Sequence, residues 1–266
     1  MAGEVILIKL GGSLITDKQR PLTAREKVIA QLMREIREAV KKLGRKKKII
    51  IGHGSGSFGH YAVKQYGLKR PGAWAAIHQV AAQLNRIVIN QGRKLDLPLI
   101  SFPPSSWILS RNHQVKKSFV KPIRVALNHQ LIPVVYGDLI IDLVRGGVIF
   151  STEKVFSVLT RELTKSRYQV KKIIHAGITN GVYDQQNQTI PLITPQNFDQ
   201  IKPCLTQARG FDITGGMDHK ITTSLALAQK QGIVSLIING QEKGELKRAI
   251  LGQEIQGTKI SLAQAS

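Results

Sequence analysis

The chain has 266 residues, 42% of them hydrophobic, which is enough to build one sizeable core. Its 39 lysine and arginine residues outnumber 17 acidic residues, and the resulting formal charge of +22 favours anionic ligands without specifying their kind. No apolar run approaches the roughly 20 residues that span a bilayer, and the start has no basic stretch before an apolar segment, so we expect a cytoplasmic protein without membrane contact.

Short β-branched runs alternate with amphipathic stretches along the chain. Residues 5–8 and 48–51 are apolar on both faces, which predicts buried parallel strands. Further strands are expected at residues 99–102, 132–136, 172–174 and 234–238, and helices at 28–43, 74–95, 152–163 and 217–231. Thr23 and Glu26 have the spacing of a capping box before the first helix, and residues 138–150 are expected to form a hairpin.

This order of elements predicts an α/β fold whose mainly parallel sheet is covered by helices on both faces. The sequence contains neither a low-complexity linker nor an internal repeat. We therefore expect residues 1–266 to form a single domain, with two lobes sharing the sheet.

The first of three glycine-rich segments, Gly11-Gly12-Ser13, directly follows the first predicted strand. Glycines there let backbone N–H groups approach an anion closely, and Lys9 and Lys18 add positive charge on either side. The spacing of a Walker A loop is missing. Taken alone, the segment is explained equally well by a tight turn.

The second segment, residues 52–60, follows the second predicted strand and contains four glycines. Ordering so many glycines has a high entropic cost, which a phosphate cradle justifies and a plain loop does not. We interpret His60, at the end of this loop, as an anion contact rather than a structural histidine. His53, next to the strand, is interpreted as structural.

The third segment, residues 212–220, opens the last long predicted helix. Thr214, Gly215 and Gly216 free backbone donors at a helix N-terminus, and Lys220 follows about one turn later. An ordinary glycine-containing cap is the alternative. Together the three segments describe a site for a polyphosphate and a second anion, and phosphoryl transfer needs such positioning and charge neutralisation more than covalent work by the protein.

The densest basic cluster lies at residues 41–48, between a predicted helix and a predicted strand. A solvated helix end explains it best, because cations suit the negative end of the helix dipole. Since no aromatic-rich nucleic-acid module accompanies it, nucleic-acid binding is the weaker hypothesis.

Four motifs occur in the order found in isopentenyl phosphate kinases, and the chain resembles that family from Val5 to about Ile238. The motifs are Lys9-Leu10-Gly11-Gly12-Ser13, Gly54-Ser55-Gly56-Ser57-Phe58-Gly59-His60, Tyr136-Gly137-Asp138 and Thr214-Gly215-Gly216-Met217-Asp218-His219-Lys220. The first marks the wider amino acid kinase superfamily, whereas the second and fourth are more specific. Fosfomycin-type antibiotic kinases are similar in the same places.

The resemblance implies a three-layer αβα open sandwich, and a cytoplasmic homodimer that uses ATP and Mg²⁺ to phosphorylate isopentenyl phosphate for isoprenoid biosynthesis in a mevalonate-type pathway. It also implies an acceptor-binding lobe at about 1–170 and a nucleotide-binding lobe at about 171–266. By position, ATP would contact Lys9, Gly11, Gly12, Ser13, Gly56, Gly215, Gly216 and Lys220. The acceptor phosphate would contact Ser55, Gly59, His60 and Gly137. The catalytic set would be Lys9, Lys18, His60 and Lys220, with Lys18 on the transferring group, and no protein metal ligand is implied.

A prenyl tail would require an apolar pocket beside the acceptor phosphate. We expect it on the helix at 74–95, unless the same side chains are ordinary core. The candidate side chains are Trp74, Ile77, Val80, Ala81 and Leu84.

Two segments depart from the family pattern. The run Gly177-Ile178-Thr179-Asn180-Gly181 stands where the family has Thr-Asp-Val-Asp-Gly, and Ser151-Thr152-Glu153-Lys154 stands where it has Ser-Gly-Asp-Asp. The acceptor side is thus intact and the nucleotide side is altered. The alternatives are a kinase for another small phosphate or phosphonate and a non-catalytic relative that binds a phosphate ligand; the retained lysines and His60 favour catalysis.

Overall fold

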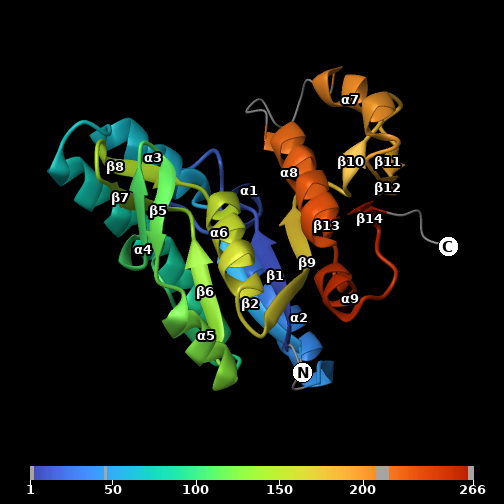
Figure 1. Ribbon diagram of the computed structural model, residues 1–266, viewed down its shortest axis with the longest axis horizontal. Helices are drawn as coiled ribbons and strands as arrows, with labels where there is room; N and C mark the ends of the chain where they lie inside the picture. The colour runs from blue at the N-terminus through green and yellow to red at the C-terminus, as the bar shows by residue number, and fades with distance from the viewer. Residues whose placement is uncertain (1–2, 45–46, 208–215, 263–266) are drawn as a thin grey trace.

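The computed structural model of the protein describes residues 3–44, 47–207 and 216–262 (Figure 1). An eight-stranded sheet runs through the middle of the molecule in the order β12-β14-β13-β9-β1-β2-β6-β3. Its strands are β12 (Leu192–Ile193), β14 (Gly257–Ile260), β13 (Val234–Asn239), β9 (Tyr168–Gly177), β1 (Gly3–Leu10), β2 (Lys47–His53), β6 (Ile132–Tyr136) and β3 (Leu99–Ser101). Every neighbouring pair is parallel except β13 and β14.

Helices cover both faces of this sheet, which confirms the three-layer αβα sandwich. The central strands β1 and β2 are buried on both sides, as their continuous apolar runs predict. One face carries α2 (Glu26–Lys42), α3 (Gly56–Tyr66), α4 (Pro71–Arg93) and α9 (Glu245–Leu251). The other face carries α5 (Lys121–Asn128) and α6 (Thr152–Thr164). Towards the end of the chain lie α7 (Phe198–Gln207), α8 (Gly216–Gln231), β10 (Val182–Tyr183) and β11 (Thr189–Ile190) (Figure 1).

A second, four-stranded sheet lies beside α4. It contains β5 (Gln114–Ser118), β4 (Ile108–Arg111), β7 (Asp138–Asp142) and β8 (Gly146–Phe150), with the short helix η1 (Pro104–Ser106) before β4. The expected hairpin is confirmed as β7 and β8, whereas the β4–β5 hairpin was not predicted.

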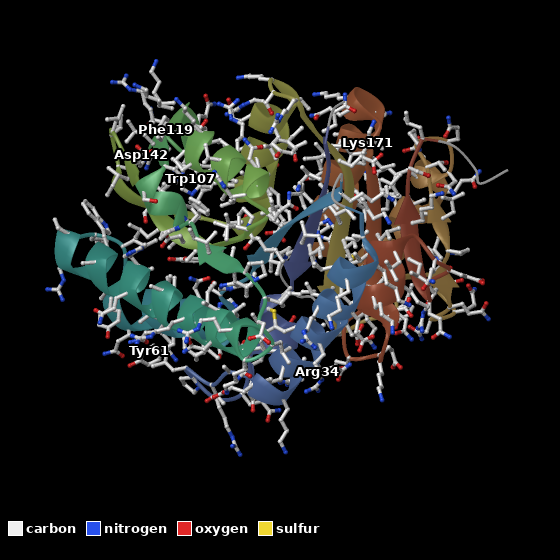
Figure 2. All side chains as sticks on the ribbon, turned by 90° about the horizontal axis from the view of Figure 1, so that it is seen from below. Arg34, Tyr61, Trp107, Phe119, Asp142 and Lys171 are labelled. Carbon is white, nitrogen blue, oxygen red and sulfur yellow. The ribbon has the colours of Figure 1, made fainter. Side chains whose placement is uncertain are left out.

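Asp142 joins the two turns of this small sheet (Figure 2). Its carboxylate accepts backbone N–H bonds from Asn112 and His113 in one turn and from Val144 and Arg145 in the other. Burial raises the pKa of Asp142, but these hydrogen bonds outweigh it and hold the pKa well below the usual range. The charged side chain therefore acts as a structural hub.

The predicted capping box is wrong. The N-cap of α2 is Arg25, and no side chain caps it. Thr23 donates its hydroxyl to the carbonyl of Pro21, and the Glu26 carboxylate accepts a hydrogen bond from Gln91 of α4 at 2.6 Å. Both side chains are thus used by a turn and by a helix–helix contact. Within the described part of the chain, none of the helices has the length and apolar character needed to cross a membrane.

Candidate active site

The loops that follow β1 and β2 cross at very short distance, and this crossing explains their glycines. A Cβ on Gly12 would lie 2.5 Å from the backbone nitrogen of Gly56, which no real side chain tolerates. Gly56 itself has φ +49°, a left-handed conformation that favours glycine. Thr16, after the short helix α1 (Gly12–Ile15), fixes the crossing: its hydroxyl donates to the Gly12 carbonyl at 2.7 Å and accepts from the Ser57 amide at 2.9 Å.

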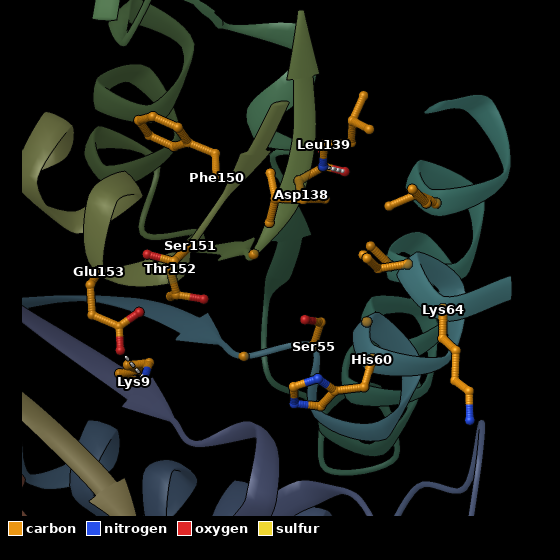
Figure 3. Close-up of a pocket in the computed structure, with 17 residues that line it drawn as sticks. Lys9, Ser55, His60, Lys64, Asp138, Leu139, Phe150, Ser151, Thr152 and Glu153 are labelled. Atoms are coloured by element: carbon orange, nitrogen blue, oxygen red, sulfur yellow. Dashed lines mark hydrogen bonds and ion pairs between the residues drawn. The ribbon is translucent and has the colours of Figure 1, made fainter. Parts of the chain in front are cut away.

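A cavity of about 410 Å³ opens beside this crossing, at the carboxyl ends of β1, β2 and β6 (Figure 3). Its two ends differ in character. The polar end is lined by Lys9, Gly54, Ser55, Gly59, His60, Lys64, Gly137, Asp138, Ser151, Thr152 and Glu153. The apolar end is lined by Val63, Ile77, Ala81, Leu139, Ile149 and Phe150.

The first turn of α3 presents polar groups to the cavity. Ser55 is its N-cap, and His60 follows little more than one turn later. Figure 3 shows the imidazole of His60 beside Ser55, facing the open space towards Lys9, whereas Lys64 points away from it. Because the N-terminus of an α-helix carries free N–H donors and positive potential, this end of the cavity suits a phosphate.

Lys9 forms the charged floor of the polar end, where only 9% of its surface is exposed. Its ammonium donates to the carboxylate of Glu153, in the first turn of α6, and forms an ion pair with it. Burial raises the pKa of Glu153, but the charge of Lys9 and this hydrogen bond outweigh that effect and lower it. A carboxylate thus stays beside Lys9 although the family's acidic element is altered here.

His175 lies next to Lys9 on the neighbouring strand, since the two residues are partners in the β1–β9 register. Burial, and then the charge of Lys9, lower the pKa of His175, and Lys220 of α8 acts in the same direction. The ring is therefore neutral at physiological pH. Its Nδ1 is buried and has no hydrogen-bond partner among the described residues.

The buried carboxylate of Asp138 ties α4 to the small sheet. One oxygen accepts from His78 Nδ1 at 2.9 Å and from the Leu139 amide at 2.8 Å, and the other accepts from the Ser105 amide at 3.2 Å. The hydrogen bond that His78 donates to Asp138 raises the pKa of His78, although partial burial opposes it. His78 lies between two wall residues of the cavity, Ile77 and Ala81, so this pair fixes the position of the apolar wall.

The expected apolar pocket is confirmed for two residues of α4. Ile77 and Ala81 line the cavity, whereas Val80 and Leu84 are buried in the main core, as their helical spacing also allows. Trp74 is not part of the described cavity wall; its indole packs against Gly146 and Gly147 of β8. The prediction was too broad because sequence spacing identifies the buried side of a helix and not what it faces.

The structure brings together five of the predicted site residues on the cavity wall. These are Lys9, Ser55, Gly59, His60 and Gly137. The crossing loops and the first turns of α1 and α3 contain Gly11, Gly12, Ser13 and Gly56. Lys220 is close enough for its charge to act on His175. Lys18 is exposed after α1 and is not part of the described cavity wall. Gly216 begins α8, whereas Gly215 and Thr214 lie outside the described residues.

Sequence reasoning did not select Asp138, Glu153 or His175 as site residues. Asp138 stood in a quoted motif, and Glu153 was counted only as part of an altered element. His175 carried no local signal, because its importance comes from pairing with Lys9 across 166 positions of chain. His53 is structural, as predicted: it is buried, bonds Asn85 and stacks on the ring of Tyr136.

Comparison with known proteins identifies the family. The sequence profile of the amino acid kinase family matches residues 4–239. An isopentenyl phosphate kinase of Methanocaldococcus jannaschii is 29% identical over 271 residues, covering 97% of this chain and 99% of that protein. One from Methanothermobacter thermautotrophicus is also 29% identical, with the same coverage.

Solved structures agree with this assignment. An X-ray structure of an isopentenyl phosphate kinase has a TM-score of 0.78 at 26% identity and covers 96% of this chain and 100% of that chain. A product complex of the T. acidophilum isopentenyl phosphate kinase, with a TM-score of 0.72 at 22% identity, covers 96% and 99% and shares the fold. Because the profile match spans far more than half of the sequence, the protein belongs to the amino acid kinase family.

Proposed function

We propose that this phosphotransferase transfers the γ-phosphoryl group of ATP to isopentenyl phosphate and forms isopentenyl diphosphate. One observation carries the proposal: a single cavity joins a cationic, glycine-lined end to an apolar end. Isopentenyl phosphate matches both ends, because it has an anionic phosphate group and a short branched hydrocarbon tail. The similarity to isopentenyl phosphate kinases over 97% of the chain supports the same choice.

In this proposal the acceptor phosphate binds at the start of α3. Ser55, Gly59, His60 and Gly137 surround it, and the tail lies along the apolar wall, which includes Ile77. The phosphate oxygen that attacks is already ionised at neutral pH, so the reaction needs no general base. The protein's task is to hold two anions in line and neutralise their charge.

ATP would lie on the side of β9 and α8. Lys9 and Lys220 would contact its phosphates, with backbone donors from Gly11, Gly12, Ser13, Gly56, Gly215 and Gly216, and Lys18 would reach the transferring group. Glu153 would keep the Lys9 ammonium in place. This assigns the acceptor to the lobe at about 1–170 and the nucleotide to the lobe at about 171–266.

The proposed Mg²⁺ would be held chiefly by the ATP phosphates and water. Within the described residues, no group of three or more His, Cys, Asp or Glu side chains gathers around a common point. Mg²⁺ commonly keeps several waters and binds through substrate phosphates. The residues that line the cavity are therefore compatible with an ATP-bound Mg²⁺ that has few or no protein ligands. The homodimer, the cytoplasmic location and the place in a mevalonate-type pathway stay predictions.

A non-catalytic, ligand-binding relative is the second candidate. Ile178 and Asn180 stand where the family has acids, and the side-chain oxygen of Asn180 is buried without a partner among the described residues. The ion pair between Lys9 and Glu153 supports catalysis, because it holds a buried lysine side chain in a fixed orientation.

The test is ADP release from Mg-ATP with and without isopentenyl phosphate. We expect release that depends on the acceptor, and His60→Ala should lower kcat/KM for isopentenyl phosphate by about 100-fold or more, as removal of one preorganised donor does. His129→Ala, which changes an exposed histidine at the end of α5, is the matched control and should behave as wild type. Acceptor binding without any release would support the binding relative and reject the kinase.

A further inference from the structure

A second cavity, of about 350 Å³, lies on the α5 face of the protein. It opens between α5 and the segment that enters β9. Its wall consists of Lys121, Arg124, Val125, Asn128, Ser166, Arg167 and Tyr168. Three of these seven side chains are cationic and none is acidic.

Arg167 is held in place rather than free in solvent. Its Nη2 donates to Asn128 Oδ1 at 2.6 Å, and its guanidinium lies 5.7 Å from the centre of the Tyr168 ring. The Tyr168 hydroxyl donates to the same Asn128 oxygen. This shared acceptor fixes the Asn128 amide, so that its NH₂ group and the remaining guanidinium N–H groups stay available as donors.

The positive charge of this cavity is not neutralised locally. Lys121, Arg124 and Arg167 form no ion pair within the part of the chain that the structure describes. The whole segment 97–137, which supplies α5, contains no Asp or Glu. Uncompensated cations that converge on one hollow raise the local concentration of anions and bind oxyanions by charge-assisted hydrogen bonds.

This cavity is separate from the active site. Tyr168 stands at the amino end of β9, where it pairs with Gly3, whereas His175 stands at the other end beside Lys9. They are seven positions apart along the strand, which corresponds to about 23 Å. The same sheet therefore carries a cationic hollow at each end.

We propose that this cavity is a second anion site, which binds a compact phosphate ligand of the diphosphate class. Arginine presents a planar fork that matches two phosphoryl oxygens, and Lys121 adds a point charge. A volume of about 350 Å³ exceeds the roughly 30 Å³ that one water occupies by enough to take two phosphoryl groups and bound water. The proposal does not depend on which acceptor the active site phosphorylates.

The test is titration calorimetry with inorganic pyrophosphate in about 0.15 M KCl, where diffuse surface attraction is screened. The wild-type protein should show two classes of site, one at the active site and one at this cavity. The double variant Lys121→Gln/Arg124→Gln should lose one class, with at least a tenfold weaker affinity. The matched control Lys116→Gln/Lys117→Gln removes the same charge from exposed positions of β5 and should keep both.

Two further outcomes decide the matter. Equal stoichiometry and affinity in all three proteins would overturn the proposal, and so would an equal loss in the control variant, which would indicate general charge alone. The exposed single variant Lys121→Glu gives an independent check if the double variant folds poorly, with ATP turnover as the readout of folding. The Lys121→Glu variant should also lose the second class of site. Its ATP turnover should stay within about twofold of wild type, since Lys121 is remote from the reacting groups.

Discussion

Lys9 and Glu153 connect the end of β1 to the first turn of α6 at the polar end of the cavity. A buried ammonium without its carboxylate would lose both its orientation and part of its charge stabilisation. We therefore expect Lys9 to depend on Glu153 for a fixed side-chain orientation, which the proposed contact with the nucleotide requires. His175, neutral beside them, adds no competing charge at physiological pH.

Glu153→Gln should lower kcat/KM for ATP by about 10- to 100-fold, the range expected when a directly acting group is misplaced by about 1 Å. Glu162→Gln is the control, because Glu162 lies on the same helix and, among the residues that the structure describes, pairs only with exposed Arg161 and Lys165. Steady-state kinetics with ATP varied would measure both. Equal losses in the two variants, or none in either, would show that Glu153 does not position Lys9.

A substitution at Gly12 tests the crossing of the two loops that follow β1 and β2. Gly12→Ala places a methyl group 2.5 Å from the Gly56 backbone nitrogen, so the loops must separate. We expect the free energy of unfolding to fall by about 1–3 kcal/mol, as in other overpacked sites, together with loss of turnover. Chemical denaturation measures the first effect. Gly72→Ala, whose Cβ would meet nothing within 4 Å, is the control and should change neither the free energy of unfolding nor turnover. A Gly12→Ala variant with wild-type stability and turnover would contradict the crossing.

Among single residues, the sequence predicted Lys9, His60 and the glycines Gly59 and Gly137 of the polar end, but it did not select the residues that position them. The reason is distance along the chain. Lys9 meets Glu153 across 144 residues, and Asp138 meets His78 across 60. Motif spacing describes one loop at a time, whereas ion pairs between elements follow from the sheet order.

Among the elements, α4 is held against the small sheet by the His78–Asp138 pair. The pKa of His78 is raised in the folded protein, so the protonated ring is favoured by folding. This contribution is fully present below the ordinary histidine pKa of about 6.5 and is lost as the pH rises through the raised value.

His78→Gln should therefore lower the melting temperature most at acidic pH, and the difference from wild type should shrink as the pH rises above about 6.5. Differential scanning calorimetry between about pH 5.5 and 8.5 measures this. His129→Gln serves as the exposed control and should show no such trend. A difference that stays constant with pH would mean that His78 acts only through packing.

Strand and helix positions were predictable because their hydrophobic periods differ, and the expected β7–β8 hairpin is present. The capping box failed because tertiary contacts use the same atoms: Glu26 bonds Gln91 of α4. The β4–β5 hairpin was missed since its strands are short and mostly polar. Local patterns thus identified six strands of the central sheet, without β12 and β14, and only the β7–β8 half of the small sheet.

For the whole molecule, the charge of +22 is a source of self-repulsion in the folded state. Raising KCl from about 0.01 to about 0.3 M shortens the screening length several-fold. We expect the melting temperature to rise by a few degrees over this range, as followed by circular dichroism. A melting temperature that falls or stays constant would show that the positive charges are already balanced by the fold.

The most direct test of the proposed activity follows both phosphorus centres of the reaction by ³¹P NMR. With Mg-ATP and isopentenyl phosphate, the account predicts that the acceptor's single resonance is replaced by the coupled pair of a diphosphate ester, in step with the appearance of ADP. It also predicts that His60→Ala slows this conversion strongly. Formation of ADP and free inorganic phosphate with the acceptor unchanged, or no ADP at all, would contradict phosphoryl transfer to isopentenyl phosphate.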